Sequence, residues 1–419
     1  MTPELIDTVR DYSRAALLRD ALAGLTVAMV AIPLSLAIAI ASGADPATGL
    51  VTAIVAGFLI SALGGSKVQI GGPTGAFIVV VYGVIARHGF DGLVTATFMA
   101  GLILLAAGWL RAGSLIAYIP EPVINGFTIG IAVIIGTSQI KDLLGLDIAS
   151  VPADLLEKLP VLWQARDSLD WRAVVVGLAT MALIVSLRRA FPRLPGLIVA
   201  IGLGSVLAAL LGGVDTLYSR FGALPATLPA PRLPDLSPAQ LRELLPSALV
   251  IAFLAGVESL LSALVADRMI GSRHRPNAEV VAQGAANLAS ALFGGLPATG
   301  AIARTATNVR AGGRSPVAGM VHAVVIAVVM LAAAPLAGFL AMPALAGLLI
   351  LTAWNMSEPH KWRGYLSDRR SDVVLLVMTL LLTVLTDLTI AIGLGVAAGL
   401  ALRLRRRAVP PADWTPPRR

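Results

Sequence analysis

Long hydrophobic runs, separated by short polar stretches, make up most of the chain. Residues 174–187, 197–211, 317–340 and 373–385 contain no Asp, Glu, Lys or Arg. A helix needs about 20 mainly apolar residues to cross the roughly 30 Å hydrocarbon core of a bilayer. The pattern predicts about fourteen helical membrane segments. They lie at residues 21–40, 47–63, 74–87, 91–110, 121–140, 172–188, 195–212, 246–266, 277–293, 299–310, 316–336, 340–356, 371–385 and 388–403.

Composition supports this interpretation, because 57% of the residues are hydrophobic and only 13% are charged, whereas soluble domains carry about 25% charged residues. The predicted fold class is therefore an all-α polytopic membrane protein. The absence of cysteine excludes disulfides, thiolate metal sites and cysteine nucleophiles. The net charge of +8 is spread over short loops, so we expect the lipid bilayer, and no nucleic acid, as a partner.

The distribution of basic residues predicts which side of the membrane each loop occupies. The stretches 188–193, 267–275, 360–370 and 403–407 hold 3, 3, 4 and 4 Lys or Arg residues, and such loops stay in the cytoplasm. An even number of segments places both termini on that side. We therefore expect a multi-pass protein of a bacterial-type plasma (inner) membrane with cytoplasmic N- and C-termini.

One phrase occurs twice in the sequence, about 225 residues apart. Residues 61–77 read S-A-L-G-G-S-K-V-Q-I-G-G-P-T-G-A-F, and residues 290–302 read S-A-L-F-G-G-L-P-A-T-G-A-I. The phrases begin the third and tenth segments, which are seven apart. Seven is an odd number, so the second copy must be inverted in the membrane, as in many secondary transporters.

Each phrase is expected to open a half-length helix. Glycine and proline disfavour helix just before Thr74, which is an acceptable N-cap. A helix over 74–87 would be about 21 Å long, so residues 63–73 must cross the rest of the membrane as extended chain enclosed by protein. The two helix N-termini would then meet near the midplane, where their free N–H groups and partial positive charges predict an anion site. The alternative is two glycine-rich packing turns.

The predicted anion site combines the two helix starts with the side chain of Arg304 and with the Ser35 hydroxyl beside the helix-bending Pro33. Arg304 either binds the anion directly or forms a structural ion pair, with Glu258 as its counter-ion. The helix-start residues are Thr74, Gly75, Ala76, Phe77, Thr299, Gly300, Ala301, Ile302 and Ala303.

Glu258 lies among apolar residues of the eighth segment, and an intramembrane carboxylate marks a functional site by default. Ser262 lies one helical turn further on the same face. A carboxyl and a hydroxyl in this arrangement could hold Na⁺ or relay a proton, which predicts cation coupling. The alternative is a structural hydrogen-bond partner for a neighbouring broken helix.

The same motifs resemble those of the SulP anion transporters, solute carrier family 26. The resemblance rests on G-G-P-T-G-A-F (71–77), E-S-L-L-S-A-L-V-A-D (258–267), G-G-L-P-A-T-G-A-I-A-R-T (294–305) and Y-I-P-E-P-V-I-N-G-F-T-I-G-I-A (118–132). It runs in order from about residue 15 to 405. It implies a seven-plus-seven inverted repeat, with a core domain of segments 1–4 and 8–11 and a gate domain of segments 5–7 and 12–14. It also implies small anionic substrates and a homodimer.

The resemblance further implies a sodium site in the bicarbonate branch of that family. Its positions correspond here to Glu258, Ser262, Gly300, Ala301 and Ile302. That branch usually has aspartate, threonine and a hydroxyl residue where this chain has glutamate, serine and isoleucine. The glutamate is more similar to proton-coupled members, so coupling to either H⁺ or Na⁺ is expected and no other cofactor.

The expected organisation is a cytoplasmic lead-in (1–20), a first repeat (21–225), a second repeat (245–405) and a disordered cytoplasmic tail (406–419) with no STAS domain. The expected function is secondary transport of sulfate or bicarbonate by elevator-like alternating access. A dicarboxylate symporter and an uncoupled anion exchanger or channel of the same fold are the alternatives. Catalytic motifs such as H-E-x-x-H and G-x-S-x-G are absent from the sequence, so an enzyme is not expected.

Overall fold

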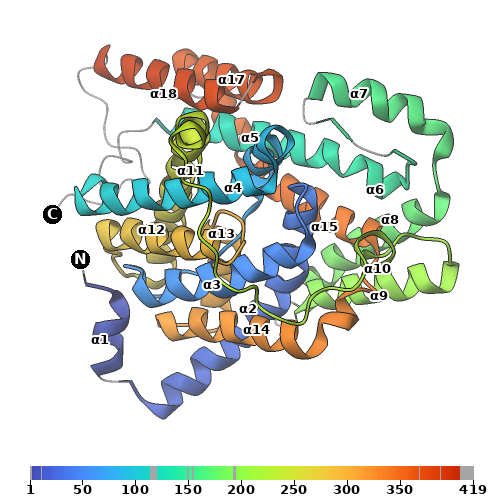
Figure 1. Cartoon of the computed structure of the whole chain (residues 1–419), viewed down its shortest axis with the longest axis horizontal. Coiled ribbons are helices and arrows are strands. Elements are labelled where there is room, and N and C mark those ends of the chain that lie inside the picture. The colour runs from blue at the N-terminus through green and yellow to red at the C-terminus, as the bar shows by residue number, and fades with distance from the viewer. Residues whose placement is uncertain are drawn as a thin grey trace.

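A computed structural model describes residues 2–10, 12–113, 120–148, 151–152, 155–191, 195–367, 369–386 and 388–405. The predicted disordered tail, 406–419, lies outside the described residues. Helices form nearly all of the regular structure, and they pack side by side in Figure 1.

The first half of the chain contains α1 (Glu4–Arg10), α2 (Arg14–Ala41), α3 (Pro46–Leu63), β1 (Gly71–Gly72), η1 (Gly75–Phe77), α4 (Ile78–Trp109), α5 (Glu121–Ser138), α6 (Ile140–Leu144), α7 (Leu155–Gln164), η3 (Ala165–Ser168), α8 (Trp171–Ala190), α9 (Gly196–Leu211) and α10 (Leu217–Phe221). The second half contains α11 (Pro238–Ile270), α12 (Pro276–Leu292), β2 (Thr299–Gly300), α13 (Ile302–Arg310), α14 (Pro316–Ala337), α15 (Met342–Met356), η4 (Pro359–Lys361), α16 (Trp362–Ser367), α17 (Arg370–Leu385) and α18 (Leu388–Arg405).

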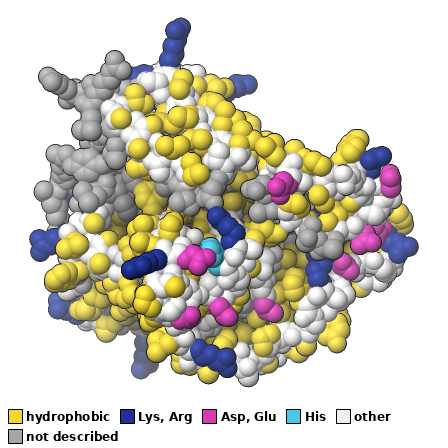
Figure 2. All heavy atoms as spheres, turned by 45° about the horizontal axis from the view of Figure 1, so that its top comes forward, with side chains coloured by type: hydrophobic (Ala, Val, Ile, Leu, Met, Phe, Trp, Pro, Cys, Tyr) yellow, Lys and Arg dark blue, Asp and Glu magenta, His cyan; other side chains and the backbone are white. Residues whose placement is uncertain are grey.

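Helices occupy every range in which the hydrophobic pattern predicts a membrane segment. Within the described residues, seven helical stretches are long and apolar enough to span a bilayer: Arg14–Ala41, Pro46–Leu63, Gly75–Trp109, Glu121–Leu144, Trp171–Ala190, Pro238–Ile270 and Pro316–Ala337. Much of the face in Figure 2 is hydrophobic, and the charged side chains on it are few. On α9, the side chains of Leu203, Val206 and Leu210 are exposed and form an apolar stripe, as expected of a lipid-facing helix.

The helices pack in two groups. One group contains α2, α3, α4 and α11–α14, with α12 against α4 and α3, and α14 against α2 and α3. In the other, α17 packs on α5 and α18, and α8 packs on α9 and α15. These groups correspond to the segments assigned above to a core and a gate. Contacts of α15 with α2 and of η1 with α5 connect the two groups.

Two helices differ in extent from the predicted membrane segments. The first long helix begins at Arg14, not near residue 21, because the Ser13 hydroxyl accepts a hydrogen bond from the Ala16 N–H and caps it (3.1 Å). The helix predicted to start at Thr299 starts at Ile302. Thr299 is held in β2, so the chain cannot turn into helix until the strand pairing ends.

The third and fourth predicted segments both lie in α4, where Gly89 separates two helices. Within α4 the backbone of Gly89 has φ 70° and ψ −180°, a conformation that glycine adopts without steric cost. The chain before Gly89, from η1 onward, is therefore a short helix of its own. This agrees with the predicted half-length helix over 74–87.

The N-terminal helix α1 docks on the start of the first extended stretch. The Glu4 N–H donates to the Gly64 carbonyl (2.9 Å), and the Glu4 carboxylate lies 3.4 Å from Arg275 and 3.6 Å from Lys67. Arg275 also pairs with Asp7, and this contact holds the pKa of the Asp7 carboxyl below its ordinary value. The part of the predicted lead-in that forms α1 thus packs against the rest of the described chain.

Candidate functional site

The two repeated phrases lie side by side in the structure. Gly71 pairs with Gly300 and Gly72 with Thr299 in a two-residue antiparallel ladder between β1 and β2. The Ala301 N–H adds a bond to the Ile70 carbonyl (2.8 Å). The helices that follow, η1–α4 and α13, therefore leave the ladder in opposite directions, with their N-terminal ends close to its centre.

Both helix starts keep free N–H groups. In α13 the first bond made by an amide is from Thr305 to the Ala301 carbonyl (2.9 Å), so the N–H groups of Ile302, Ala303 and Arg304 have no acceptor within the helix. Ala301 provides no side-chain cap. In η1, the Thr74 side chain does not cap the helix either. A short helix with uncapped amides attracts an anion.

The first helix start lies where the two helix groups face each other. Met356 of α15 and Ile135 of α5 come within 2.9 and 3.6 Å of the position that a Cβ on Gly75 would take. Ile302 and Ala303, at the start of α13, are exposed. Because residue 75 is glycine, Met356 and Ile135 can approach the backbone at the start of η1.

Glu258 of α11 reaches the first helix start directly. The Thr74 hydroxyl donates a hydrogen bond to its carboxylate (2.8 Å), which explains why Thr74 does not cap η1. Glu258 is half-buried. The predicted coupling residue and the predicted anion site therefore share a hydrogen bond.

Ser262 lies on the same side of α11 but contacts the other helix start. Its hydroxyl is 3.2 Å from the hydroxyl of Thr305 in α13, and Thr305 accepts a hydrogen bond from the Ile70 N–H (3.0 Å). The oxygens of Glu258 and Ser262 thus meet different elements. No group of three or more His, Cys, Asp or Glu residues suited to a metal occurs in the part of the chain that the structure describes.

Arg304 is 1% exposed and turns back toward the opposite phrase. Its guanidinium donates to the carbonyl of Pro73, and a Cβ on Gly72 would collide with the same guanidinium. It makes no direct contact with the Glu258 carboxylate, which accepts from Thr74 instead, so Glu258 as counter-ion of Arg304 stays a prediction. The Nε and one Nη of Arg304 have no hydrogen-bond partner, which leaves donors available beside the helix starts.

Four further predicted residues have the following surroundings. The Thr299 hydroxyl donates to the Ala255 carbonyl of α11 (2.9 Å). Gly300 faces the amide of Gln69, which would collide with any added side chain. The Ser35 hydroxyl is fully buried in α2 and has no hydrogen-bond partner. Phe77 is buried in the apolar core that surrounds η1.

A fully buried carboxylate near the site, that of Glu279, is not among the predicted residues. Glu279 of α12 is fully buried and accepts hydrogen bonds from the Gly65 N–H (2.9 Å), the Ser259 hydroxyl (3.0 Å) and the Gln283 amide (3.0 Å). It fixes the beginning of the first extended stretch against α11 and α12. Polar residues at 279, 283 and 287 recur every four positions along one helix face, and this spacing could have revealed the network.

Asn287 performs the same task for the second stretch. Its side chain exchanges two hydrogen bonds with the backbone of Ala298, both 2.9 Å. The Leu296 N–H donates to Thr52 (2.6 Å), and Asn308 donates to the Val68 carbonyl (2.8 Å). Side chains therefore supply the partners that a helix would have supplied to these carbonyls and amides.

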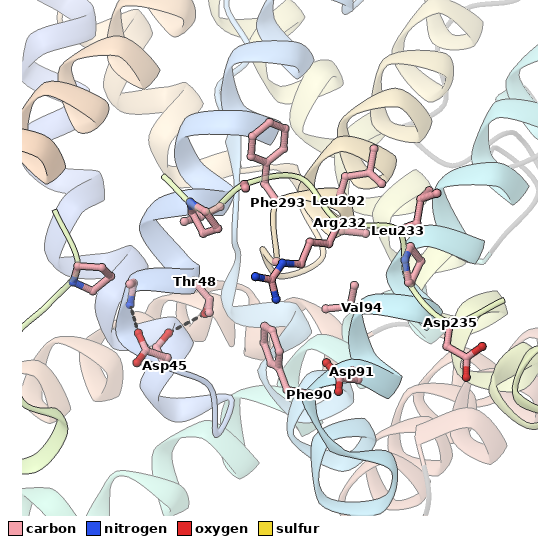
Figure 3. A pocket seen from close by; sticks show the side chains of 18 of the residues that line it. Asp45, Thr48, Phe90, Asp91, Val94, Arg232, Leu233, Asp235, Leu292 and Phe293 are labelled. Carbon is pink, nitrogen blue, oxygen red and sulfur yellow. Dashed lines mark hydrogen bonds between the residues drawn. The ribbon is translucent and has the colours of Figure 1, made fainter. Parts of the chain in front are cut away.

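A separate pocket of about 720 Å³ lies beside the N-terminal end of α3 and the C-terminal end of α12. Figure 3 shows the Arg232 guanidinium between Thr48, Phe90 and Asp91. The main-chain N–H of Arg232 donates a hydrogen bond to the Leu292 carbonyl (2.7 Å). This bond attaches the link between α10 and α11 to the end of α12. The half-helix residues do not line this pocket.

Comparison with known proteins gives consistent matches. The model of the sulfate permease family matches residues 17–379. The chain is 41% identical over 399 residues to the putative sulfate transporter YvdB of Bacillus subtilis, covering 95% of this chain and 75% of that protein. It is 33% identical over 389 residues to the bicarbonate transporter BicA of Synechocystis, covering 90% and 68%.

Two solved structures are also similar. The transmembrane domain of a cyanobacterial bicarbonate transporter BicA superposes with a TM-score of 0.81 at 32% identity, covering 92% of this chain and 98% of that one. SLC26A9 superposes with a TM-score of 0.87 at 18% identity, covering 97% and 68%. The second likeness concerns the fold alone.

The Glu279 network yields a first prediction. All three partners of the Glu279 carboxylate donate to it, so the amide of Glu279→Gln would direct its NH₂ group at a donor and leave buried groups unsatisfied. The expected loss of stability is about 1–3 kcal/mol, seen as a lower midpoint of thermal unfolding in detergent. Glu157→Gln, at an exposed glutamate, is the control. Equal midpoints for the two variants would contradict the proposed role of the network.

Proposed function

The chain belongs to the sulfate permease family, and we propose that it is a secondary active transporter of small inorganic anions, with sulfate or bicarbonate as substrate. It is a multi-pass membrane transporter, not an enzyme. The relatives named above are a putative sulfate transporter and a bicarbonate transporter, which supports these two substrates ahead of a dicarboxylate.

The observation that carries the proposal is the meeting of two uncapped helix starts at the β1–β2 ladder. In the proposed site, the N–H groups at 75–76 and 302–304 bind the anion together with the unpartnered nitrogens of Arg304. Thr74, Phe77, Thr299, Gly300 and Ala301 position these groups. Helix-end amides accept any small anion that fits, so the site is suited to an anion carrier.

We propose fourteen spans in a seven-plus-seven inverted repeat. The antiparallel pairing of β1 with β2 and the opposite directions of η1–α4 and α13 support an inverted relation between the halves. Alternating access would follow from a rigid-body shift of α2–α4 and α11–α14 against the other helices, with the helix starts at the boundary. The proposed orientation has both termini in the cytoplasm, and the proposed assembly is a homodimer.

Glu258 is the proposed coupling group. Its carboxylate shares a hydrogen bond with Thr74 at the first helix start, so an ionised Glu258 and a bound anion would repel each other at close range. Binding of H⁺ or Na⁺ at Glu258 removes this repulsion and favours the anion. For Na⁺, Ser262 and the carbonyls of residues 300–302 would complete the oxygen ligands.

Substrate and coupling ion are tested by uptake into proteoliposomes of the purified chain. Labelled sulfate, bicarbonate and fumarate are offered at two pH values, with and without Na⁺. We expect saturable accumulation of sulfate or bicarbonate driven by a proton or sodium gradient. Accumulation of fumarate alone would support a dicarboxylate symporter. Flux without saturation and without accumulation would support a channel.

Glu258→Gln is expected to separate coupling from binding. The amide keeps an acceptor for the Thr74 hydroxyl but cannot take up a proton or compensate Na⁺, so gradient-driven accumulation should be lost while exchange of internal for external anion continues. Accumulation and exchange are measured in the same proteoliposome preparation. Gradient-driven accumulation at the wild-type level would remove Glu258 from the coupling mechanism.

Arg304→Ala is expected to weaken anion binding. A hydrogen bond to a charged group contributes roughly 1.5–3 kcal/mol, so KM for the transported anion should rise about 10- to 100-fold. Arg304→Lys retains the charge and should recover part of the affinity. Arg310→Ala, at the exposed far end of α13, is the control. An unchanged KM in a folded Arg304→Ala protein would assign Arg304 a structural role only.

A further inference from the structure

The short helix α7 has three distinct sides, and its residues can be assigned to them from their exposure. Lys158 and Leu162, one turn apart, are 2% and 7% exposed and face the protein. Leu156, Leu159 and Trp163 are 63%, 47% and 69% exposed. Their spacing of three and four residues places these three side chains in one stripe. We call them the α7 stripe.

The polar residues of α7 lie on the third side. Glu157 and Gln164 are exposed, and their spacing of seven residues, two turns, places them on one line along the helix. The helix thus presents protein contacts, large apolar side chains and polar side chains in turn around its axis. An apolar stripe between a protein face and a polar face is typical of a helix that lies at a membrane surface.

A buried lysine fastens α7 to a long apolar helix. The Lys158 ammonium donates a hydrogen bond to the Ser138 hydroxyl at the end of α5 (2.6 Å), and α7 also contacts α17. Figure 1 shows α7 at the edge of the molecule, outside α5. The α7 stripe therefore has a fixed direction relative to the neighbouring helices.

Two further helices also expose apolar side chains, and one of them, α17, contacts α7. On α8, Trp171, Val175 and Leu178 are exposed at helical spacing, and α8 is long and apolar enough to span a bilayer. On α17, Leu381 and Leu385 are exposed near the end of the helix. Surfaces of this kind on a membrane protein are covered by lipid chains.

The aromatic residue of the stripe also has a suitable neighbour. The Arg166 guanidinium lies 4.9 Å from the centre of the Trp163 ring, as a cation–π contact. Tryptophan and arginine both favour the boundary between headgroups and acyl chains, where the ring is buried and the charge is hydrated. Trp163 therefore has the surroundings of an interfacial anchor.

We propose that α7 is an interfacial lipid-binding helix, with Leu156, Leu159 and Trp163 inserted among the acyl chains at the edge of one leaflet. Phospholipid is the partner that the stripe fits. Through Lys158 and Ser138, this contact holds α5 at a fixed depth, and Ile135 of α5 is a neighbour of Gly75. The consequence for transport rests on the proposed function, whereas the lipid contact does not.

The chain contains no cysteine, so single cysteines introduced on α7 can be spin-labelled without background. Leu159→Cys and Trp163→Cys probe the stripe, and Glu157→Cys and Gln164→Cys are matched controls on the polar side of the same helix. The labelled full chains are reconstituted in phosphatidylcholine–phosphatidylglycerol vesicles. Collision rates with O₂ and with a water-soluble nickel chelate are then measured for each label.

We expect the ratio of O₂ to nickel collisions to be severalfold higher at 159 and 163 than at 157 and 164. Equal, low ratios at all four positions would overturn the proposal. Spin–spin broadening at 159 and 163 without oxygen access would also overturn it, because a second copy of the chain would then cover the stripe. Neither result depends on transport activity, so the proposed function is tested separately.

A second measurement keeps the natural side chains of the stripe. Brominated lipids quench tryptophan fluorescence on contact, and Trp163→Phe removes one emitter while retaining an apolar ring. We expect the difference in emission between wild type and Trp163→Phe to be quenched by lipids brominated near the headgroup. An unquenched difference would contradict the proposal even if the cysteine variants fail to fold.

Discussion

The structure depends on one constraint: two stretches of extended backbone lie inside a helical membrane protein, and each of their polar groups needs a partner. The two-residue ladder between β1 and β2 provides hydrogen bonds only where the two stretches meet, at Gly71–Gly72 and Thr299–Gly300. Around it, Glu279 and Asn287 of α12, Thr52 of α3 and Asn308 of α13 bind further amides and carbonyls of these stretches. Apolar helices therefore carry polar side chains in the positions that face this extended chain.

The groups left over by this arrangement define the site. Amides at the two helix starts cannot bond within their helices, and neither start has a side-chain cap. The Thr74 hydroxyl, which could have capped η1, is directed to Glu258 instead. Arg304 uses part of its guanidinium to hold Pro73 and keeps other donors unpartnered. Arg304 thus helps to hold one of the two extended stretches in place and also carries unpartnered hydrogen-bond donors.

Sequence reasoning could predict the parts of this arrangement that depend on local chemistry. Hydrophobic runs place the helices, and repeated Gly and Pro residues place the two interruptions. Directions of side chains could not be predicted, because they depend on contacts between distant segments. Arg304 and Glu258 attract each other in principle, yet the first binds a carbonyl and the second a hydroxyl. The start of α13 was predicted three residues early because pairing with β1 holds Thr299 and Gly300 in a strand.

The attachment of Arg232 to the end of α12 has a geometric consequence. The link from α10 to α11 is divided by the hydrogen bond from the main-chain N–H of Arg232 to the Leu292 carbonyl. The stretch between Phe221 and Arg232 is about ten residues long, and it can extend to roughly 35 Å at most. This tether sets an upper limit on how far α12 can travel from α10 while the bond persists, and a larger excursion would first have to detach it.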